Sequence, residues 1–298
     1  PGGSPLARWD RVYRDVARRL EPLFASRVTA IRYQGLDALS HVHWSSAEPG
    51  RFNRLAPAGA AGAAVLDKYY DEIDADIGRA IAEKLGLTPE IVGFNADEDM
   101  NDDLRNMVWK VHYLGTQPAD VMMHVPVDEL LARANDKVRI FGSYHRETLA
   151  LARNPDIVPR LSGSAAVALE IFTREKIGVE TASLADSFLL GVLNGRLRDN
   201  VVHFKTVSEA AKGLADGQIA AILSPRAELE SALAGQTRFP IETSKFAELK
   251  VDSWPLGMAV KVEEMELAEA IGGALADLKR DGSIAAIFKR HGISYFPA

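Results

Sequence analysis

The chain has 298 residues, a formal net charge of -6 and 47% apolar residues, which is typical of a soluble globular protein of one or two domains. The acidic balance argues against a nucleic-acid partner, and the absence of cysteine excludes disulfide bonds and thiolate metal sites. No apolar run approaches the roughly 20 residues that span a bilayer, and no signal peptide is visible behind the start Pro1-Gly2-Gly3-Ser4, which looks trimmed.

The amino-terminal part of the sequence predicts a helix followed by a long loop. Leu6, Trp9 and Val12 begin an apolar series at helical spacing, and arginines fill the other faces. We interpret this segment as a terminal helix packed on the body of the protein, with a membrane or partner surface as the alternative. The Pro-, Gly- and Ala-rich stretch 47–64 predicts a loop.

From residue 74 onward, helices alternate with short apolar strands. Apolar residues at helical spacing predict a helix over 74–86, which Gly86 ends. Strands are predicted over 90–94 and 119–125, with a helix over 104–111 between them. This alternation predicts an α/β fold with a mostly parallel sheet.

The same alternation restarts after residue 155. The predicted strands cover 176–180, 201–204 and 218–223, and the predicted helices cover 183–193, 208–214, 267–278 and 283–291. Ser208 and Ser283 are expected to cap their helices, because a serine hydroxyl accepts hydrogen bonds from the free amides of the first turn. The second part is therefore also α/β.

Several of these segments resemble, in order and spacing, those of the amino-acid-type periplasmic solute-binding proteins of ABC transporters (family 3, type II). The matching segments are residues 74–86, Ala119-Asp120-Val121-Met122, the turn-like Phe141-Gly142-Ser143-Tyr144-His145, residues 207–210 with 217–221, and residues 256–260 with 275–282. Residues 1–70 match the family poorly, and Ser40 to Trp44 are taken as the first strand only by position.

The resemblance implies a two-lobed α/β fold with two mostly parallel sheets and a two-segment hinge. Residues 1–150 plus 255–298 would form lobe 1, and residues 151–254 would form lobe 2. A small ligand would lie between the lobes at the ends of the strands and be captured by hinge closure. The resemblance further implies a periplasmic monomer that is not an enzyme, uses no cofactor and serves an ABC transporter permease.

Ligand-binding residues are expected from both lobes. The candidates are His43, Trp44, His124 and Tyr144 from lobe 1, and Thr181, Ser183 and Ser224 from lobe 2. Thr181 and Ser183 stand at the start of a helix, whose free amides can bind an anion or a carbonyl group. Ordinary core packing is the alternative interpretation for each aromatic residue.

Two positions depart from the family pattern. Leu131 stands where members that bind α-amino acids place the arginine that holds the carboxylate, and Ser224-Pro225 stand where an acidic residue meets the ammonium. A buried zwitterion without either partner would lose on the order of several kcal/mol. We therefore predict weak binding of common α-amino acids. Residues 122–126 resemble binding-protein homologues encoded beside quinoprotein alcohol dehydrogenases, which implies an accessory role with a periplasmic dehydrogenase.

A metal site and an enzyme remain as alternatives. His41, His43, His124 and His145 could supply neutral imidazoles to a transition metal. The simpler interpretation is that His41 and His43 are ordinary surface or core groups and that His124 and His145 are hydrogen-bonding residues of the cleft. A lyase- or dehydratase-type enzyme would need an acid such as Glu147, which a hinge salt bridge explains as well. The sequence contains no G-x-S-x-G, phosphate loop, dinucleotide fingerprint or H-E-x-x-H motif.

A calcium loop is a third alternative. Asp97, Asp99, Asn101 and Asp103 alternate as in an EF-hand, but Asp102 replaces the required glycine. Acidic residues at the start of a helix more simply cap it and favour its dipole.

Overall fold

The computed structural model describes residues 63–92, 99–111, 117–243 and 245–298, so the predictions for the amino-terminal helix and the first strand lie outside it. The strands are β1 (Met122–Pro126), β2 (Val138–Arg153), β3 (Ile177–Glu180), β4 (Val201–Phe204), β5 (Ala221–Pro225), β6 (Ile241–Thr243) and β7 (Ser253–Lys261). The helices are α3 (Ala63–Lys84), α4 (Met100–Leu104) with the π-helical turn η1 (Arg105–Trp109), α5 (Glu129–Ala134), α6 (Ala165–Ala168), α7 (Leu184–Gly191), α8 (Val207–Ala215), α9 (Arg226–Ala232), α10 (Met265–Arg280) and α11 (Ser283–Arg290). The 3₁₀ segments are η2 (Glu170–Thr173), η3 (Val192–Gly195) and η4 (Arg198–Asn200). None of the described helices is long and apolar enough to cross a membrane.

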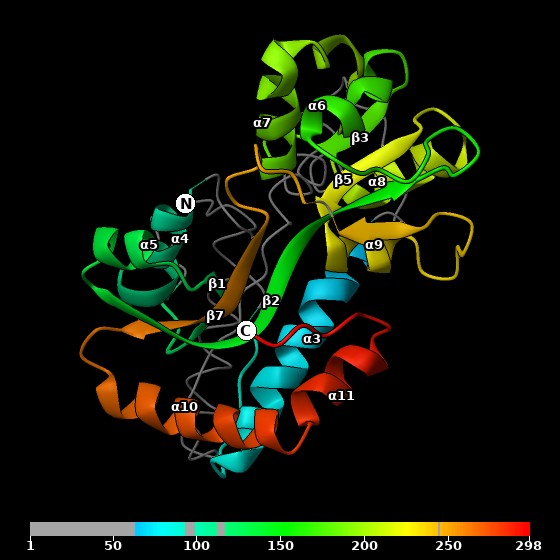
Figure 1. Cartoon of the computed structure of the whole chain (residues 1–298). Helices are drawn as coiled ribbons and strands as arrows, with labels where there is room; N and C mark the ends of the chain where they lie inside the picture. Colours follow the sequence, from blue (N-terminus) through cyan, green and yellow to red (C-terminus); the bar gives the residue numbers. More distant parts are fainter. Residues whose placement is uncertain (1–62, 93–98, 112–116, 244) are drawn as a thin grey trace, which may run out of the picture.

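One long strand, β2, joins the two ends of the molecule (Figure 1). The strand order is β1-β7-β2-β5-β3-β4, with β6 also paired to β2. β2 pairs with β7 as far as Thr148, which lies opposite Ser253, and then pairs with β5 from Leu149, which lies opposite Pro225. The two segments that run between the ends of the molecule therefore lie side by side.

The direction of pairing differs from the expectation of mostly parallel sheets. Among the described strands, β3 runs parallel to β4 and to β5, as expected for alternating helices and strands. The pairs that β2 makes with β5, β6 and β7 are antiparallel, as is the pair of β1 with β7. The reason is that β2 and β7 cross the molecule in opposite directions, which sequence alternation alone does not reveal.

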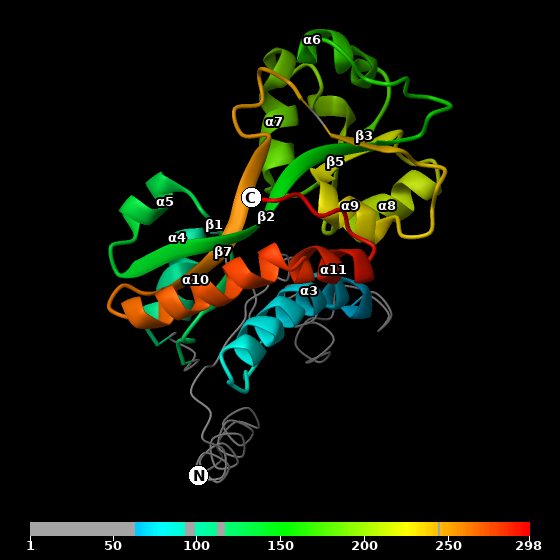
Figure 2. The same cartoon turned by 60° about the horizontal axis from the view of Figure 1, so that its bottom comes forward.

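Helices cover both ends of this sheet. At the β1 end, α3, α10 and α11 bury Ile77, Ile271 and Phe288 against the strands (Figures 1 and 2). At the other end, the alternation along β2 divides the core, because successive side chains of a strand point to opposite faces. Leu149 and Leu151 pack with α7, whereas Ala150 and Ala152 pack with α8 and α9.

Several element boundaries differ from the prediction. α3 begins at Ala63, well before residue 74, because the alanines at the end of the expected loop have high helix propensity. Gly86, in the left-handed conformation with φ +67°, follows its end as expected. The predicted strand over 119–125 begins three residues later, at Met122, and β4 covers 201–204 as predicted.

The two expected serine caps are wrong. α8 is capped by Thr206, whose hydroxyl accepts a hydrogen bond from the Glu209 amide at 3.1 Å, so Ser208 lies inside the helix. α11 begins at Ser283 itself, after Gly282 at φ +84°, and the Asp281 carboxylate accepts the Ser283 amide at 3.0 Å. In the segment considered as a calcium loop, Asp99 caps α4 by accepting the Asn101 amide at 2.8 Å. For α8 and α11, the capping position lies one or two residues before the expected serine.

The turn expected at residues 141–145 is an irregularity inside β2. The pairing with β7 shifts between Phe141 and His145, and Gly142 has φ +66°. A side chain at Gly142 would also meet Met258, because an added Cβ would lie 2.8 Å from its terminal methyl. Tyr144 and His145 follow this bulge and are both buried. In a regular strand, these two successive side chains would point to opposite faces of the sheet.

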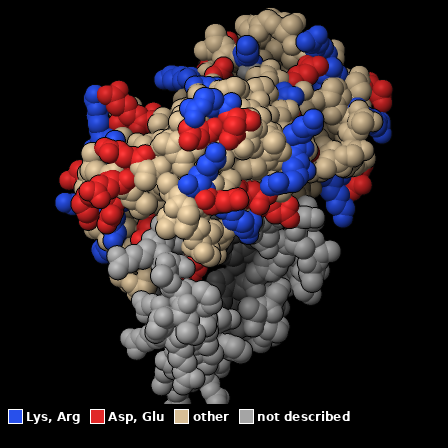
Figure 3. Space-filling model, turned by 90° about the horizontal axis from the view of Figure 1, so that it is seen from below, with Lys and Arg blue, Asp and Glu red and all other residues tan. Residues whose placement is uncertain are grey.

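The surface viewed from below carries charges of both signs. Figure 3 shows Lys and Arg side chains interspersed with Asp and Glu side chains on the described part of this face. Ion pairs join side chains of opposite charge on the described surface, such as Lys84 with Asp281 at 3.4 Å and Arg79 with Asp76 at 3.0 Å. A nucleic-acid backbone requires a concentrated basic area, which the described part of the face in Figure 3 does not show.

Candidate functional site

A small polar cavity lies where α3, β1 and β2 meet. It is lined by Ile73, Asp74, His124, Tyr144, His145, Glu147, Leu256 and Phe288. Its volume is about 10 Å³, close to the space that one water molecule needs. Titratable side chains are rare in a protein interior, so their concentration around one cavity identifies it as a candidate site.

Asp74, His124 and Tyr144 form one hydrogen-bonded network in this cavity. The Tyr144 hydroxyl donates to Asp74 Oδ1 at 2.8 Å, and His124 Nδ1 lies 3.0 Å from Asp74 Oδ2. The His124 amide donates to the Tyr144 hydroxyl oxygen at 3.2 Å. His124 also has φ +60°, at a register shift of β1, so the network holds this residue in a backbone conformation that is costly outside glycine.

The two histidines of the cavity have opposite charge preferences. Burial disfavours the imidazolium of His124, but the Asp74 carboxylate outweighs this effect and raises the pKa of His124. Burial, together with the charge of His124, lowers the pKa of His145 to about 3. His145 is therefore neutral at physiological pH, stacked on Phe288 with ring centroids 4.4 Å apart, and its Nδ1 accepts the Phe296 amide at 3.4 Å.

Glu147 is a deeply buried carboxyl group of β2, in the region where β2 pairs with β7. It is 4% exposed and lies opposite Trp254 of β7. Its Oε1 accepts the Thr148 amide at 2.8 Å and the Ala227 amide of α9 at 3.5 Å. Burial, reinforced by the nearby Glu228 carboxylate, raises the pKa of Glu147 to about 7. No salt bridge of Glu147 occurs among the described residues, so the hinge ion pair considered for it is not found there.

A second group of carboxylates lies where β3 and β5 end. These strands are parallel, so Glu180 at the end of β3 and Ser224 near the end of β5 share one edge of the sheet. The Ser224 hydroxyl donates to Glu228 Oε2 at 3.0 Å. Burial, followed by the charges of Glu228 and Glu209, raises the pKa of Glu180 to about 9. Ser224, at the position where the family has an acidic residue, carries no charge. Glu180 of β3 and Glu228 of α9 nevertheless present acidic groups at this edge of the sheet.

The predicted site residues fall into separate places. His124 and Tyr144 are brought together, and Ser224 lies beside Glu228, whose charge acts on Glu147 as well as on Glu180. Thr181 is exposed, and its hydroxyl donates to the Phe204 carbonyl at 3.0 Å. Ser183 caps α7 by accepting the Asp186 amide at 3.1 Å. His43 and Trp44 lie outside the described residues.

Sequence reasoning missed the acidic members of the site. Asp74 was assigned only to a helix, although it lies 50 positions from the histidine that it contacts. Glu228 has one recognisable signal, because it stands four residues after Ser224 at the start of α9 and can reach back to it. His41 and His43 are outside the described residues, and within those residues no group of three His, Asp or Glu side chains is placed to hold a metal ion.

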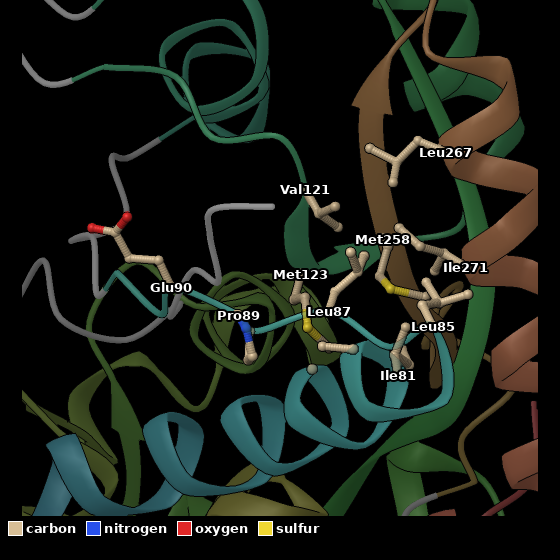
Figure 4. A pocket seen from close by; sticks show the side chains of 12 residues that line it. Ile81, Leu85, Leu87, Pro89, Glu90, Val121, Met123, Met258, Leu267 and Ile271 are labelled. Carbon is tan, nitrogen blue, oxygen red and sulfur yellow. The ribbon is translucent and has the colours of Figure 1, made fainter. Parts of the chain in front are cut away.

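A larger apolar pocket lies between the carboxy-terminal half of α3, β1 and α10 (Figure 4). Its lining is Gly78, Ile81, Ala82, Leu85, Leu87, Pro89, Glu90, Val121, Met123, Met258, Leu267 and Ile271, around about 40 Å³. Figure 4 shows the Met123, Ile81 and Leu85 side chains close together, whereas Glu90, the one charged residue of the lining, lies apart. Small-ligand sites need convergent polar groups to orient their ligand. The polar cavity is therefore the better candidate.

The comparisons with known proteins concern the fold. No protein-family model and no curated protein sequence matches the chain. The GluR0 ligand-binding core in complex with L-glutamate has a TM-score of 0.56 at 15% identity, over 90% of this chain and 99% of its own. An ancestral cationic amino acid solute-binding protein has a TM-score of 0.55 at 16% identity, over 74% of this chain and 85% of its own. A histidine kinase sensor domain with similarity to periplasmic binding proteins has a TM-score of 0.54 at 18% identity, over 92% and 99%.

These similarities confirm the predicted fold class. The chain has the α/β, two-lobed fold of periplasmic binding proteins. At such low identities the likeness is one of fold, and the function has to be argued from the site.

Proposed function

We propose that the chain is a solute-binding protein that captures a small ligand between its two lobes and closes around it. The lobes are residues 1–150 with 255–298, and residues 151–254. The observation that carries the proposal is the arrangement of ionisable groups. Glu180 ends β3, and the Glu228 carboxylate of α9 accepts the Ser224 hydroxyl at 3.0 Å near the end of the neighbouring parallel strand β5, so two carboxylates stand at one edge of the sheet. In open α/β sheets, ligands bind at such strand ends.

The carboxylates favour a ligand that carries positive charge. The pKa of Glu180 is raised first by burial and then by repulsion from the negative charges of Glu228 and Glu209. A cation between them would relieve this repulsion by pairing with the charged forms. At the position of the expected carboxylate-binding arginine, Leu131 is half-buried, and the nearby Arg133 pairs with Glu129 on the surface. We therefore expect an amine or guanidine without a free carboxylate.

The proposed location is the periplasm, and the proposed partner is an ABC transporter permease that receives the ligand. An accessory role beside a periplasmic quinoprotein dehydrogenase is the alternative, and it rests on the resemblance of residues 122–126. We propose that the protein acts as a monomer.

A lyase- or dehydratase-type enzyme is a second candidate, because Asp74 and His124 form a carboxylate–imidazole pair 3.0 Å apart. Such a pair can act as a general base. The cavity beside this pair is about 10 Å³, which admits neither a substrate nor a ligand in this conformation, so its size does not separate the two candidates. Binding is preferred because the proposed ligand contacts are the strand-end carboxylates Glu180 and Glu228, which lie outside this cavity.

Native mass spectrometry of protein purified without denaturation tests the proposal, because a closed protein keeps its ligand. A released compound with a positive charge is the expected result. Adding it back should reduce the radius measured by small-angle scattering, since closure brings the lobes together. An unchanged scattering profile at saturating ligand would contradict hinge closure, and turnover of the compound would favour the enzyme.

A further inference from the structure

Residues 293–298, which follow α11, run back from lobe 1 to the place where β2 and β7 lie side by side. Figures 1 and 2 both show it, in red, passing from the end of α11 toward β2 on the side where α9 lies. Ile293 is buried in the core that α3, α10 and α11 share, which anchors the start of the segment in lobe 1.

The segment then contacts α9 of lobe 2 through Ser294. The Ser294 amide donates to Glu230 Oε2 at 2.7 Å, and the Ser294 hydroxyl donates to Glu230 Oε1 at 2.7 Å. The side chain of Glu230 is 12% exposed, and Arg226 of the same helix donates to it at 2.7 Å. Hydrogen bonds to an ionised carboxylate are stronger than neutral ones, and partial burial shields these from water.

The following residues fasten the segment to the hinge strand. The Arg146 amide donates to the Phe296 carbonyl at 2.9 Å, and the Phe296 amide donates to His145 Nδ1 at 3.4 Å. The Arg226 guanidinium lies over the Phe296 ring, 5.7 Å from its centroid. One short segment thus contacts lobe 1, the hinge and lobe 2.

We propose that residues 293–298 form a strap that holds the two lobes at a fixed angle in the protein without ligand. β2 and β7 lie side by side and act as the hinge, and α9 also contacts lobe 1 through Ala227, which is buried in the core of α3, α10 and α11. The carboxy-terminal segment adds polar contacts that restrict the rotation, because α9 cannot turn relative to α11 unless the Ser294–Glu230 contact breaks or moves with it. The proposal rests on the proposed function, in that it describes what restrains the closing motion.

Tight packing of a chain segment would explain the aromatic contacts but not the polar ones. Phe288, Tyr295 and His145 stack within lobe 1 and the hinge, and they need no help from α9. The Ser294–Glu230 pair adds nothing to that cluster and serves only to join two different lobes. Its loss should therefore change the relation of the lobes more than their internal stability.

The absence of cysteine makes the angle between the lobes directly measurable. Glu269→Cys on α10 and Lys212→Cys on α8 are exposed positions, one on each lobe, and can carry spin labels as the only thiols of the chain. Double electron–electron resonance on the ligand-free protein then gives the distribution of distances between the lobes. The test variant is Glu230→Ala, and Ser294→Ala removes one of the two strap bonds.

The matched control is Glu242→Ala. Glu242 is also a partly exposed carboxylate with an arginine partner, Arg153 at 3.0 Å, but both residues lie in lobe 2. We expect a narrow distance distribution for the labelled parent and for Glu242→Ala, a distribution at least twice as wide for Glu230→Ala, and an intermediate one for Ser294→Ala. A labelled variant lacking residues 294–298 should match Glu230→Ala.

Identical distributions for all folded variants would overturn the strap. Circular dichroism establishes that each variant is folded, and if Glu230→Ala fails to fold, the comparison of Ser294→Ala with the parent decides the matter. The proposed function fails separately, when the retained ligand leaves the parent distribution unchanged. A strap without ligand-driven closure and closure without a strap are thus distinct results.

Discussion

Replacing Glu147 with glutamine should stabilise the protein at alkaline pH and leave it almost unchanged at pH 4.5. Burial, reinforced by Glu228, raises the pKa of Glu147 from 4.5 to about 7 in the folded state. The folded protein therefore binds a proton there more tightly than the unfolded chain does. The stability due to that proton is fully present below pH 4.5 and is lost as the pH rises to 7.

The size of the effect follows from the shift. Each pKa unit corresponds to about 1.4 kcal/mol, so a rise from 4.5 to about 7 corresponds to a penalty of about 3 kcal/mol once Glu147 is ionised. Glutamine keeps the Oε1 acceptor for the Thr148 and Ala227 amides and removes the charge. Glu147→Gln should thus unfold with a free energy up to about 3 kcal/mol above the parent at pH 8.

Urea unfolding of both proteins at several pH values between 4.5 and 8 measures the difference. Glu170→Gln is the control, because Glu170 forms an exposed ion pair with Arg196, and such pairs contribute about 0–1 kcal/mol. If the parent and Glu147→Gln show the same change of stability with pH, or if the variant is less stable at pH 8, the interpretation of Glu147 as a buried acid with a raised pKa is refuted.

Three further results follow from the site. Tyr144→Phe should lower the free energy of unfolding by about 1–3 kcal/mol, since it leaves a buried Asp74 oxygen without the donor 2.8 Å away; urea unfolding measures this, and an unchanged midpoint would contradict a structural role for the network. Thr181→Val should weaken binding of the retained ligand by about 1–3 kcal/mol in calorimetry, because closure would bury the threonine hydroxyl against it. The ligand-free stability should change little, because the hydrogen bond from Thr181 to the Phe204 carbonyl is exposed to water; the opposite pattern removes Thr181 from the site. In thermal-shift screens, cationic amines without a carboxylate should stabilise the protein, by about 2.7 kcal/mol at 100 times the dissociation constant, whereas standard amino acids, lysine and arginine included, should give no shift. A clear shift with any standard amino acid would disprove the argument from Leu131.

The sequence revealed those features that depend on neighbouring residues. The helix after residue 183 and the strand at 201–204 follow from local periodicity and were predicted within a few residues. The cap of α8 was misassigned because Thr206 and Ser208 are both suitable residues, and the choice depends on where the backbone turns.

The ionisable cluster could not be predicted, because its members come from distant parts of the chain. His124 meets Asp74 only after β1 is placed against α3, and Tyr144 joins them only because the bulge at Gly142 turns it inward. The acidic edge depends on the parallel alignment of β3 and β5, which determines that Glu180 and Glu228 are neighbours. Such placements are set by packing and have no periodic signal.

The pairing of Thr148 with Ser253 has a consequence for how such a chain can be built. Residues 149–252, which contain nearly all of the proposed lobe 2 (residues 151–254), begin and end at adjacent positions of two antiparallel strands, whose backbones lie roughly 5 Å apart. This entire stretch is therefore topologically an insertion into a strand pair, and its removal would need only a short turn to reconnect the chain. A gene could gain or lose the second lobe in one recombination event without threading or reordering the strands of the first.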